Sequence, residues 1–271
     1  LNAMYENSPA AIDIAGTLES ISEITSEHLY LCHKTFYAPD NMVMILAGDF
    51  NIEETFNYIE THQHSRRTFE PSEIERFIPE EPYGVKTPHK TMELAVSTPK
   101  VMLGFKSLPD DSDSATRERR DAAMLFALDM VFGEQSPYYE ELVERGIIDD
   151  SFNFAYQEEE IIRHTLMAVE TEDYETFTKE IVRIIEEVKG TDFFTDKRLQ
   201  SQKRELMGDY LTSLNSPEYI ANQFTKYYFD GYDLYNVPKV IDSITLEDIK
   251  NYFNSSIDTK NMVEVIVKAY E

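Results

Sequence analysis

The sequence has little cysteine, little basic charge and no long apolar stretch. Its single cysteine, Cys32, excludes an internal disulfide bond and any zinc site built from several cysteines. This cysteine usage fits a reducing compartment, so we expect a cytoplasmic protein. Cys32 falls among apolar residues of a predicted helix, and we expect its side chain to be buried in a core.

Basic residues are scarce relative to acidic ones. The chain has 25 lysines and arginines against 51 aspartates and glutamates, and its formal net charge is −26. Such a surface repels phosphate backbones and anionic lipid headgroups, so we expect neither nucleic acid nor a membrane as a partner. The acidity is open to two interpretations, attraction of basic peptides or simple charge repulsion between soluble molecules.

No apolar run approaches the roughly 20 residues that cross a bilayer. Even the stretch 42–47 is far shorter, and we expect no membrane-spanning segment. The chain begins at Leu1 and lacks the basic-then-apolar pattern of a signal peptide. We therefore expect it to be a piece of a longer protein.

An α/β unit is predicted near the start of the chain. A helix is expected from an N-cap at Thr25 to the stop at Pro39, because apolar residues recur at helical spacing. The uniformly apolar stretch 42–47 predicts a buried strand. Asn51 then predicts the cap of a second helix. The apolar faces of the two helices consist of Leu29, Cys32 and Phe36, and of Ile52, Phe56 and Ile59.

The same unit recurs near the other end of the chain. At a constant offset of 220 residues, seven of 23 aligned positions are identical, and the predicted helix and strand stay in step. This pattern indicates a duplicated domain. The identical positions of the first copy are Ile21, Ile24, Thr25, Glu27, Asn41, Met42 and Val43.

Between the copies, prolines and charges without apolar periodicity predict an irregular linker. We therefore divide the chain into residues 1–65, a linker at 66–92, and a second domain at 93–271. The second domain has strands expected at 101–105, 152–156 and 164–170, and helices at 119–132, 138–145, 174–188 and within 196–229. Far fewer residues precede the first copy, so we expect the first domain to lack its front half.

The sequence carries no recognisable catalytic motif. None of the histidines (His28, His33, His62, His64, His89, His164) lies in H-E-x-x-H or its inverse H-x-x-E-H, and we predict no catalytic residue and no metal ligand in this chain. His62 and His64 have the density for adventitious metal binding but no third ligand. His164 alternates with apolar residues, and a core histidine is the favoured interpretation. The acidic runs at Asp110, Asp149 and Glu158 are interpreted as solvated faces rather than carboxylate sites.

Three stretches resemble the insulinase/pitrilysin-type family of zinc metallopeptidases. They are 13–21, 35–42 with Gly48-Asp49, and 214–224, the last of which is similar to the branch found in Gram-positive bacteria. The resemblance implies an α+β fold, an α/β sandwich of two homologous domains of the LuxS/processing-peptidase-like type that enclose a chamber. It also implies that the zinc ligands lie in the front of the first domain, before Leu1. This chain is then the carboxyl-terminal two-thirds, and zinc belongs to the parent protein.

Many members of that family use an arginine and a tyrosine seven positions apart to hold the substrate backbone. Near Gly146 the ungapped register places Leu142 and Asp149 at these positions, whereas counting from Arg145 reaches Phe152. Neither choice supplies a tyrosine hydroxyl. Arg145 is our candidate substrate-binding residue, with a surface charge at a helix end as the alternative.

We expect a fragment of a zinc-dependent endopeptidase that acts on small or unfolded polypeptides. This chain forms chamber wall and enclosing half, and is itself inactive. One alternative is that the parent is a non-catalytic structural or substrate-binding partner of an active homologous subunit, and a weaker one is an unrelated acidic binding module. A half-domain without its partner elements leaves apolar surface bare, so we also expect self-association.

Overall fold

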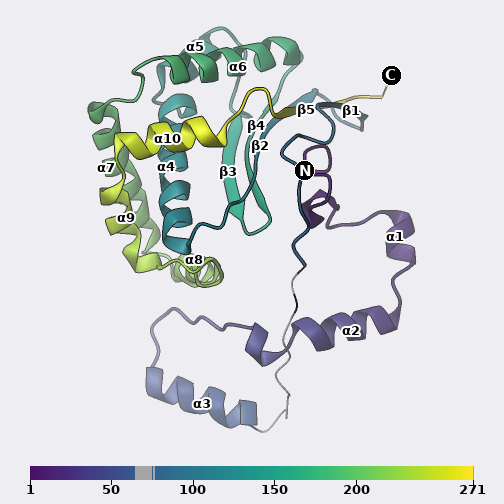
Figure 1. Ribbon diagram of the computed structural model, residues 1–271. Coiled ribbons are helices and arrows are strands. Elements are labelled where there is room, and N and C mark those ends of the chain that lie inside the picture. The colour runs from purple at the N-terminus through teal and green to yellow at the C-terminus, as the bar shows by residue number, and fades with distance from the viewer. Residues whose placement is uncertain (65–74, 76, 271) are drawn as a thin grey trace. The chain divides into compact units, whose positions relative to one another are not determined.

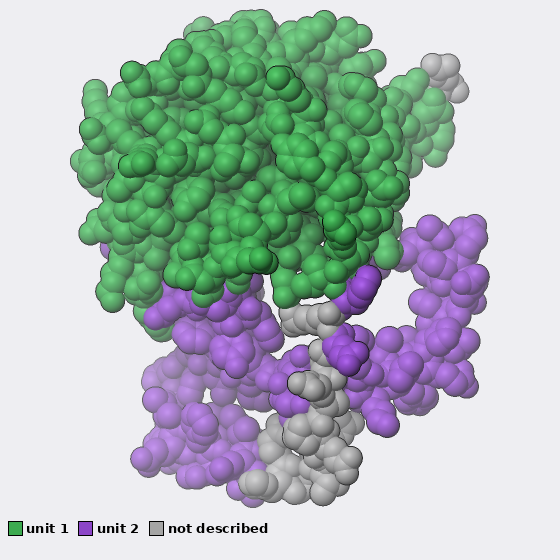
Figure 2. Space-filling view, viewed as in Figure 1, with its two compact units in different colours: residues 1–13, 78–209, 235–271 green, residues 14–77, 210–234 purple. Residues whose placement is uncertain are grey.

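The computed structural model describes residues 1–64, 75 and 77–270 of the chain. The chain divides into two compact units, which Figure 2 shows in different colours. Unit 1 comprises residues 1–13, 78–209 and 235–271, and unit 2 comprises residues 14–77 and 210–234. The domain boundaries expected from the sequence stay a prediction, and most of the segment between 65 and 76 lies outside the described residues.

Unit 1 is built on one five-stranded sheet in the order β1-β5-β2-β4-β3 (Figure 1). β1 and β5 are parallel, and the other neighbours are antiparallel. β5, the last strand of the chain, therefore lies between β1 and β2. It links the end of the chain to the earlier strands of unit 1. The strands are β1 (His89–Glu93), β2 (Lys100–Ser107), β3 (Asn153–Glu159), β4 (Ile162–Glu170) and β5 (Met262–Lys268).

Most helices of the chain belong to unit 1, and the apolar spacing of their sequences explains how they pack. In α6, the buried residues recur every three to four positions and form one stripe that faces the core. The strands and helices expected between residues 101 and 229 are confirmed, with ends shifted by a few residues. The helices are α4 (Ser114–Phe132), α5 (Pro137–Glu144), α6 (Tyr174–Gly190), α7 (Asp196–Ser213), α9 (Val237–Ser243) and α10 (Leu246–Ser256), with the short turns η1 (Pro9–Ala11) and η3 (Leu234–Asn236).

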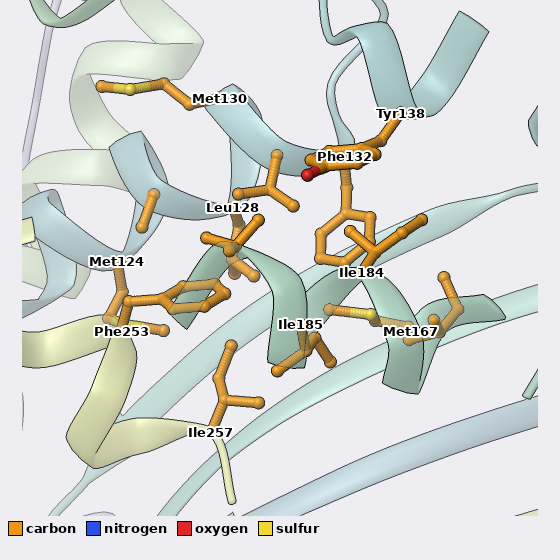
Figure 3. Packing of buried hydrophobic residues seen from close by; sticks show 14 of the residues in the cluster. Met124, Leu128, Met130, Phe132, Tyr138, Met167, Ile184, Ile185, Phe253 and Ile257 are labelled. Atoms are coloured by element: carbon orange, nitrogen blue, oxygen red, sulfur yellow. The ribbon is translucent and has the colours of Figure 1, made fainter. Parts of the chain in front are cut away.

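The main core lies between these helices and one face of the sheet. Leu103 and Met167 point from neighbouring strands into a cluster that includes Leu128 of α4 and Phe253 of α10, all fully or almost fully buried. Figure 3 shows Met167 of β4 in one cluster with helical side chains that include Leu128 and Phe253. Since each buried large side chain contributes about 1.5–3 kcal/mol, this cluster is the principal source of stability in unit 1.

The opposite face of the sheet is covered by the start of the chain. Ala3, Met4 and Tyr5 are buried there in a smaller cluster with Val263 of β5 and Ile162 at the start of β4. Gly104 of β2 makes this packing possible, because a Cβ atom at that position would lie 2.3 Å from the Met4 Cε atom. The first residues of the chain are thus an integral part of unit 1.

Unit 2 consists of helices and irregular segments within the described residues. Its elements are α1 (Leu18–Ser22), α2 (Ser26–Phe36), η2 (Pro39–Asn41), α3 (Ile52–His64) and α8 (Pro217–Asp230), and it also holds the end of α7. The N-cap expected at Thr25 is confirmed, because its side chain accepts a hydrogen bond from the His28 amide. The Asn51 side chain likewise accepts from the Glu54 amide at the start of α3.

The internal repeat holds at the level of helices. α2 and α10 have the same length, and their first residues, Ser26 and Leu246, are 220 positions apart. Both helices begin with a threonine N-cap, Thr25 and Thr245, in a capping box. α1 and α9 precede them in the same order. The duplication inferred from seven identities therefore extends to helix length and capping.

Two expectations for the first copy are wrong. Residues 42–47 are not a strand, and Met42, Met44 and Leu46 are each more than half exposed. The equivalent strand β5 is held between β1 and β2, whereas the described residues supply no partner strand for 42–47. Cys32 is likewise exposed rather than buried, because the described residues supply no sheet in unit 2 to cover α2, whereas α10 packs on the sheet of unit 1.

The fold is mixed α and β, as expected. Among the described residues no helix combines the length and the apolar character that a bilayer-crossing segment requires.

Candidate functional site

The histidines of the described residues are scattered over both units. His28 caps the start of α2, and His33 stacks on Tyr37. His62 bonds its own helix, and the His64 side chain lies outside the described part. Nowhere in the described part do three or more His, Cys, Asp or Glu side chains gather where they could hold a metal ion. A catalytic zinc needs three such ligands, so the described residues do not fit one.

Arg145 lies at the carboxyl end of α5, where its guanidinium is bound by two carboxylates. Its Nη1 donates to Glu141 at 2.8 Å and its Nη2 to Glu180 at 2.7 Å. Arg183 contacts the same two glutamates. Hydrogen bonds from Arg145 and Arg183 lower the pKa of Glu180 to about 2. Arg145 is therefore a half-exposed member of an ion-pair network between α5 and α6, available to a ligand from the solvent side.

The positions considered as partners of Arg145 have other roles. Leu142 is fully buried in the core, and Asp149 accepts hydrogen bonds from the Ser151 amide and hydroxyl. Phe152 packs in an aromatic cluster with Phe132 and Phe177. None of these positions supplies a hydroxyl to stand beside a guanidinium.

Two of the acidic runs are not solvated faces throughout. The Glu158 side chain is fully buried and accepts a 2.6 Å hydrogen bond from Arg120 of α4, itself buried. Arg120 also donates to Asp110, which pairs with Arg163 as well. Although partial burial acts to raise it, the pKa of Asp110 is lowered to about 2 by the bonds from Ser112 and Arg120. This cluster is an internal ion-pair network that links α4 to β3 and β4.

A cavity of about 460 Å³ opens in unit 1 next to this network. Its wall combines apolar and carboxylate side chains, a combination that accepts a cationic group with an aliphatic stem. The cavity is lined by Ile78, Pro79, Glu81, Leu108, Pro109, Asp110, Asp111, Ser112, Arg117, Glu159, Glu160 and Ile161. The charge of Asp110 is already balanced by two arginines. The exposed Asp111 and Glu159 add further carboxylates to the lining, and Glu159 accepts a 2.7 Å hydrogen bond from Gln157.

A second buried polar cluster lies on the face of the sheet that the start of the chain covers. Lys106 of β2 is fully buried, and its Nζ atom donates to Glu81 at 2.6 Å and to the Gly84 carbonyl at 2.9 Å. His164 of β4 is buried as well, and its Nδ1 atom lies 2.9 Å from the Tyr5 hydroxyl. Burial lowers the pKa of His164 to about 4, so the ring is neutral at pH 7. The interpretation of His164 as a core histidine is consistent with this position.

The sequence pattern did not reveal this cluster. Lys106 sits at the end of an apolar strand, and a lysine there is normally solvated. Glu81 lies in a stretch of prolines and acids with no periodicity, and Tyr5 lies in a short irregular segment. The signal that was available is the position of Lys106 within β2. Alternate residues of a strand point to the same face of the sheet, so this position sets the face on which Lys106 lies.

The chain is similar in sequence to known peptidases. The family description "Peptidase M16 inactive domain" matches residues 23–206. The chain is 32% identical over 268 residues to the uncharacterized zinc protease YmfH of Bacillus subtilis, a match that covers 98% of this chain and 62% of YmfH.

The fold is similar to that of solved peptidase structures. A putative M16-like peptidase from Alicyclobacillus acidocaldarius superposes with a TM-score of 0.92 at 30% identity, over 99% of this chain and 64% of that one. A peptidase M16 inactive domain from Pseudomonas fluorescens has a TM-score of 0.76 at 19% identity, which is a likeness of fold alone. The chain spans less than two-thirds of YmfH and of the Alicyclobacillus protein.

Proposed function

Because the chain belongs to the M16 peptidase family, whose inactive domain matches residues 23–206, we propose that it is the enclosing, non-catalytic part of a zinc-dependent endopeptidase. This is the insulinase/pitrilysin-type family that the sequence resembles. The observation that carries the proposal is the combination of this match with described residues that hold no metal-ligand group.

Zinc, in this proposal, is bound by the part of the parent protein that these residues do not include. YmfH, named a zinc protease, is covered only to 62% by this chain, which leaves room for a zinc-binding part. Zinc bound in that part would supply a Lewis acid for the substrate carbonyl and for the attacking water. The residues of this chain contribute enclosure and contacts to the substrate backbone, which position the peptide and exclude solvent. We propose small or unfolded polypeptides as the substrates.

The zinc content of the purified chain tests this division of labour. After dialysis against metal-free buffer, the chain is expected to retain much less than one zinc per molecule and to cleave an unstructured peptide no faster than a buffer blank. One zinc per chain that survives dialysis, together with cleavage, would refute the proposal. Zinc without cleavage would point to adventitious binding by the histidines near the end of α3.

Arg145 remains the proposed substrate contact within this chain. Its guanidinium is half exposed and held in a fixed orientation by Glu141 and Glu180, which suits a group that hydrogen-bonds a peptide carbonyl. In the full-length parent, Arg145→Gln is expected to raise KM several-fold with little change in kcat. Arg183→Gln, which removes another member of the same network, is the matched control. Equal effects of both substitutions would reduce Arg145 to a structural residue.

A non-catalytic parent is the second candidate function. The observation that favours it is the missing arginine–tyrosine pair, since Leu142 is buried in the core and Asp149 bonds to Ser151. Such a parent would bind substrate or support an active homologous subunit. It is distinguished by the full-length protein, which would bind an unfolded polypeptide but neither retain zinc nor cleave.

We further propose a cytoplasmic location. The only cysteine of the chain is exposed and unpaired, a state that a reducing compartment preserves. Exclusive recovery of the parent protein from the cytoplasmic fraction of its host is the expected result.

A further inference from the structure

Two segments that are far apart in the sequence lie side by side on the face of the unit 1 sheet that the start of the chain covers. The Lys86 amide donates to the Met4 carbonyl at 3.2 Å, and the Thr87 amide donates to the Ala3 carbonyl at 2.8 Å. Residues 3–8 and 81–87 therefore run together where the chain leaves unit 1 and where it returns. Between them, the chain makes the whole excursion of residues 14–77 through unit 2.

Glu81 joins the two segments to each other and to the sheet. Its carboxylate accepts hydrogen bonds from the amides of Glu6, Asn7 and Ser8, at 2.7–2.8 Å. The same carboxylate accepts the 2.6 Å bond from buried Lys106. A single side chain thus satisfies three successive backbone donors of one segment and the charge of β2.

Tyr5 and Met4 supply the apolar part of the same contact. The Tyr5 ring is fully buried, and its hydroxyl accepts a hydrogen bond from the Arg163 amide and reaches His164 Nδ1. Met4 fills the space above Gly104. The side chain of any larger residue at position 104 would occupy that space. The seat for residues 3–8 is therefore shaped in both polarity and volume.

We propose that residues 3–8 and 81–87, with Lys106 and His164, form a clasp that closes the base of the excursion 14–77. Holding the ends of so long a segment together costs chain entropy, which a shared buried anchor offsets. A buried lysine–glutamate pair is a poor choice for stability alone, because desolvation cancels much of its attraction, but it selects one arrangement of its partners. Opening the clasp frees both ends of the excursion at once while the helix-covered face of the sheet stays intact.

Hydrogen exchange of the full chain, followed by mass spectrometry, tests the clasp. The double substitution Glu81→Gln/Lys106→Met removes both charges together, so that no unpaired charge stays buried. The amides of 6–8 and of 86 and 87 are expected to exchange at least tenfold faster, with the β5 amides and the β4 amides beyond Arg163 unchanged. The matched control is Lys100→Met/Glu170→Gln, an exposed ion pair on the same two strands as Lys106 and His164. It is expected to leave all these rates unchanged.

Three other outcomes would overturn the clasp. Unchanged exchange at 6–8 would mean that Glu81 does not hold the segment. Faster exchange at 6–8 with unchanged amides at 86 and 87 would mean that the two ends are not joined. Loss of protection across β4 and β5 together with both segments would make the cluster part of the general core. Tyr5→Phe, which keeps the ring and removes only its hydroxyl, provides a second variant that is expected to fold and to show a smaller acceleration at 6–8.

Discussion

Buried charge is the residue-scale feature that distinguishes unit 1. Arg120 and Glu158, like Lys106 and Glu81, pair inside the protein with almost no solvent exposure. Each pair contributes little as a whole, because desolvation opposes attraction, yet the removal of one partner strands the other. Single and paired substitutions are therefore expected to differ sharply.

Arg120→Met is expected to lower the free energy of unfolding by about 3–5 kcal/mol, because buried Glu158 loses its 2.6 Å partner and keeps only Arg163, at 4.0 Å. Arg120→Met/Glu158→Gln should recover part of that loss. The sequence has no tryptophan, so urea unfolding is followed by circular dichroism. Lys179→Met, at an exposed pair with Glu175, is the control, with an expected change of about 0.5 kcal/mol or less. A comparable loss in both variants would contradict this account of the buried pair.

His164 makes stability depend on pH. Its folded-state pKa, about 4, is below the ordinary value of 6.5, so the folded state disfavours the protonated ring. The contribution is fully present above pH 6.5 and is lost as the pH falls toward 4, by about 3 kcal/mol in total. His164→Gln, which keeps a hydrogen-bonding group near Tyr5, removes this component. Denaturant titrations from pH 7 to 4 are expected to show a steeper decline for the natural chain, and parallel declines would contradict the assignment.

At the scale of elements, the repeat provides a matched pair of helices in different surroundings. Ile249 of α10 is fully buried, whereas the equivalent Leu29 of α2 is 62% exposed. Ile249→Ala is expected to cost about 2–5 kcal/mol, because it leaves a cavity. Leu29→Ala is expected to change the stability of this chain by less than about 0.5 kcal/mol. Urea unfolding of both variants measures the difference, and a large loss in Leu29→Ala would mean that α2 is covered in solution.

Periodicity and capping were sufficient to predict most elements of unit 1. α6 and β2 were predicted close to their observed ends, because their apolar spacing reports a face that is buried within this chain. Residues 42–47 were predicted as a strand and are not one, since a strand exists only through its neighbours. The prediction that Cys32 is buried is wrong for the same reason. The clasp could not be predicted, because the sequence does not show which charged side chains pair in the folded protein.

For the molecule as a whole, the main feature is the exposed apolar surface of unit 2. Ile21, Leu29, Met44 and Phe56 are each at least half exposed. The net charge of −26 opposes association at low ionic strength. We expect this chain to self-associate in the micromolar range, more strongly at about 0.5 M salt, where repulsion is screened.

Light scattering across that concentration range measures the expected increase in mass. Met44→Lys/Phe56→Lys is expected to reduce it, and Met102→Lys, at a partly exposed position on the unit 1 sheet, serves as the control. A constant monomer mass at both salt concentrations would show that the exposed side chains of unit 2 drive no association.

We propose that this chain encloses substrate and does not itself cut it. The most direct measurement is the rate at which one unstructured peptide is cleaved by this chain and by the full-length parent, with the zinc content of both determined in the same samples. Zinc and cleavage are expected in the parent, and neither is expected in this chain. Cleavage by this chain alone, abolished by a chelator and restored by zinc, would contradict it.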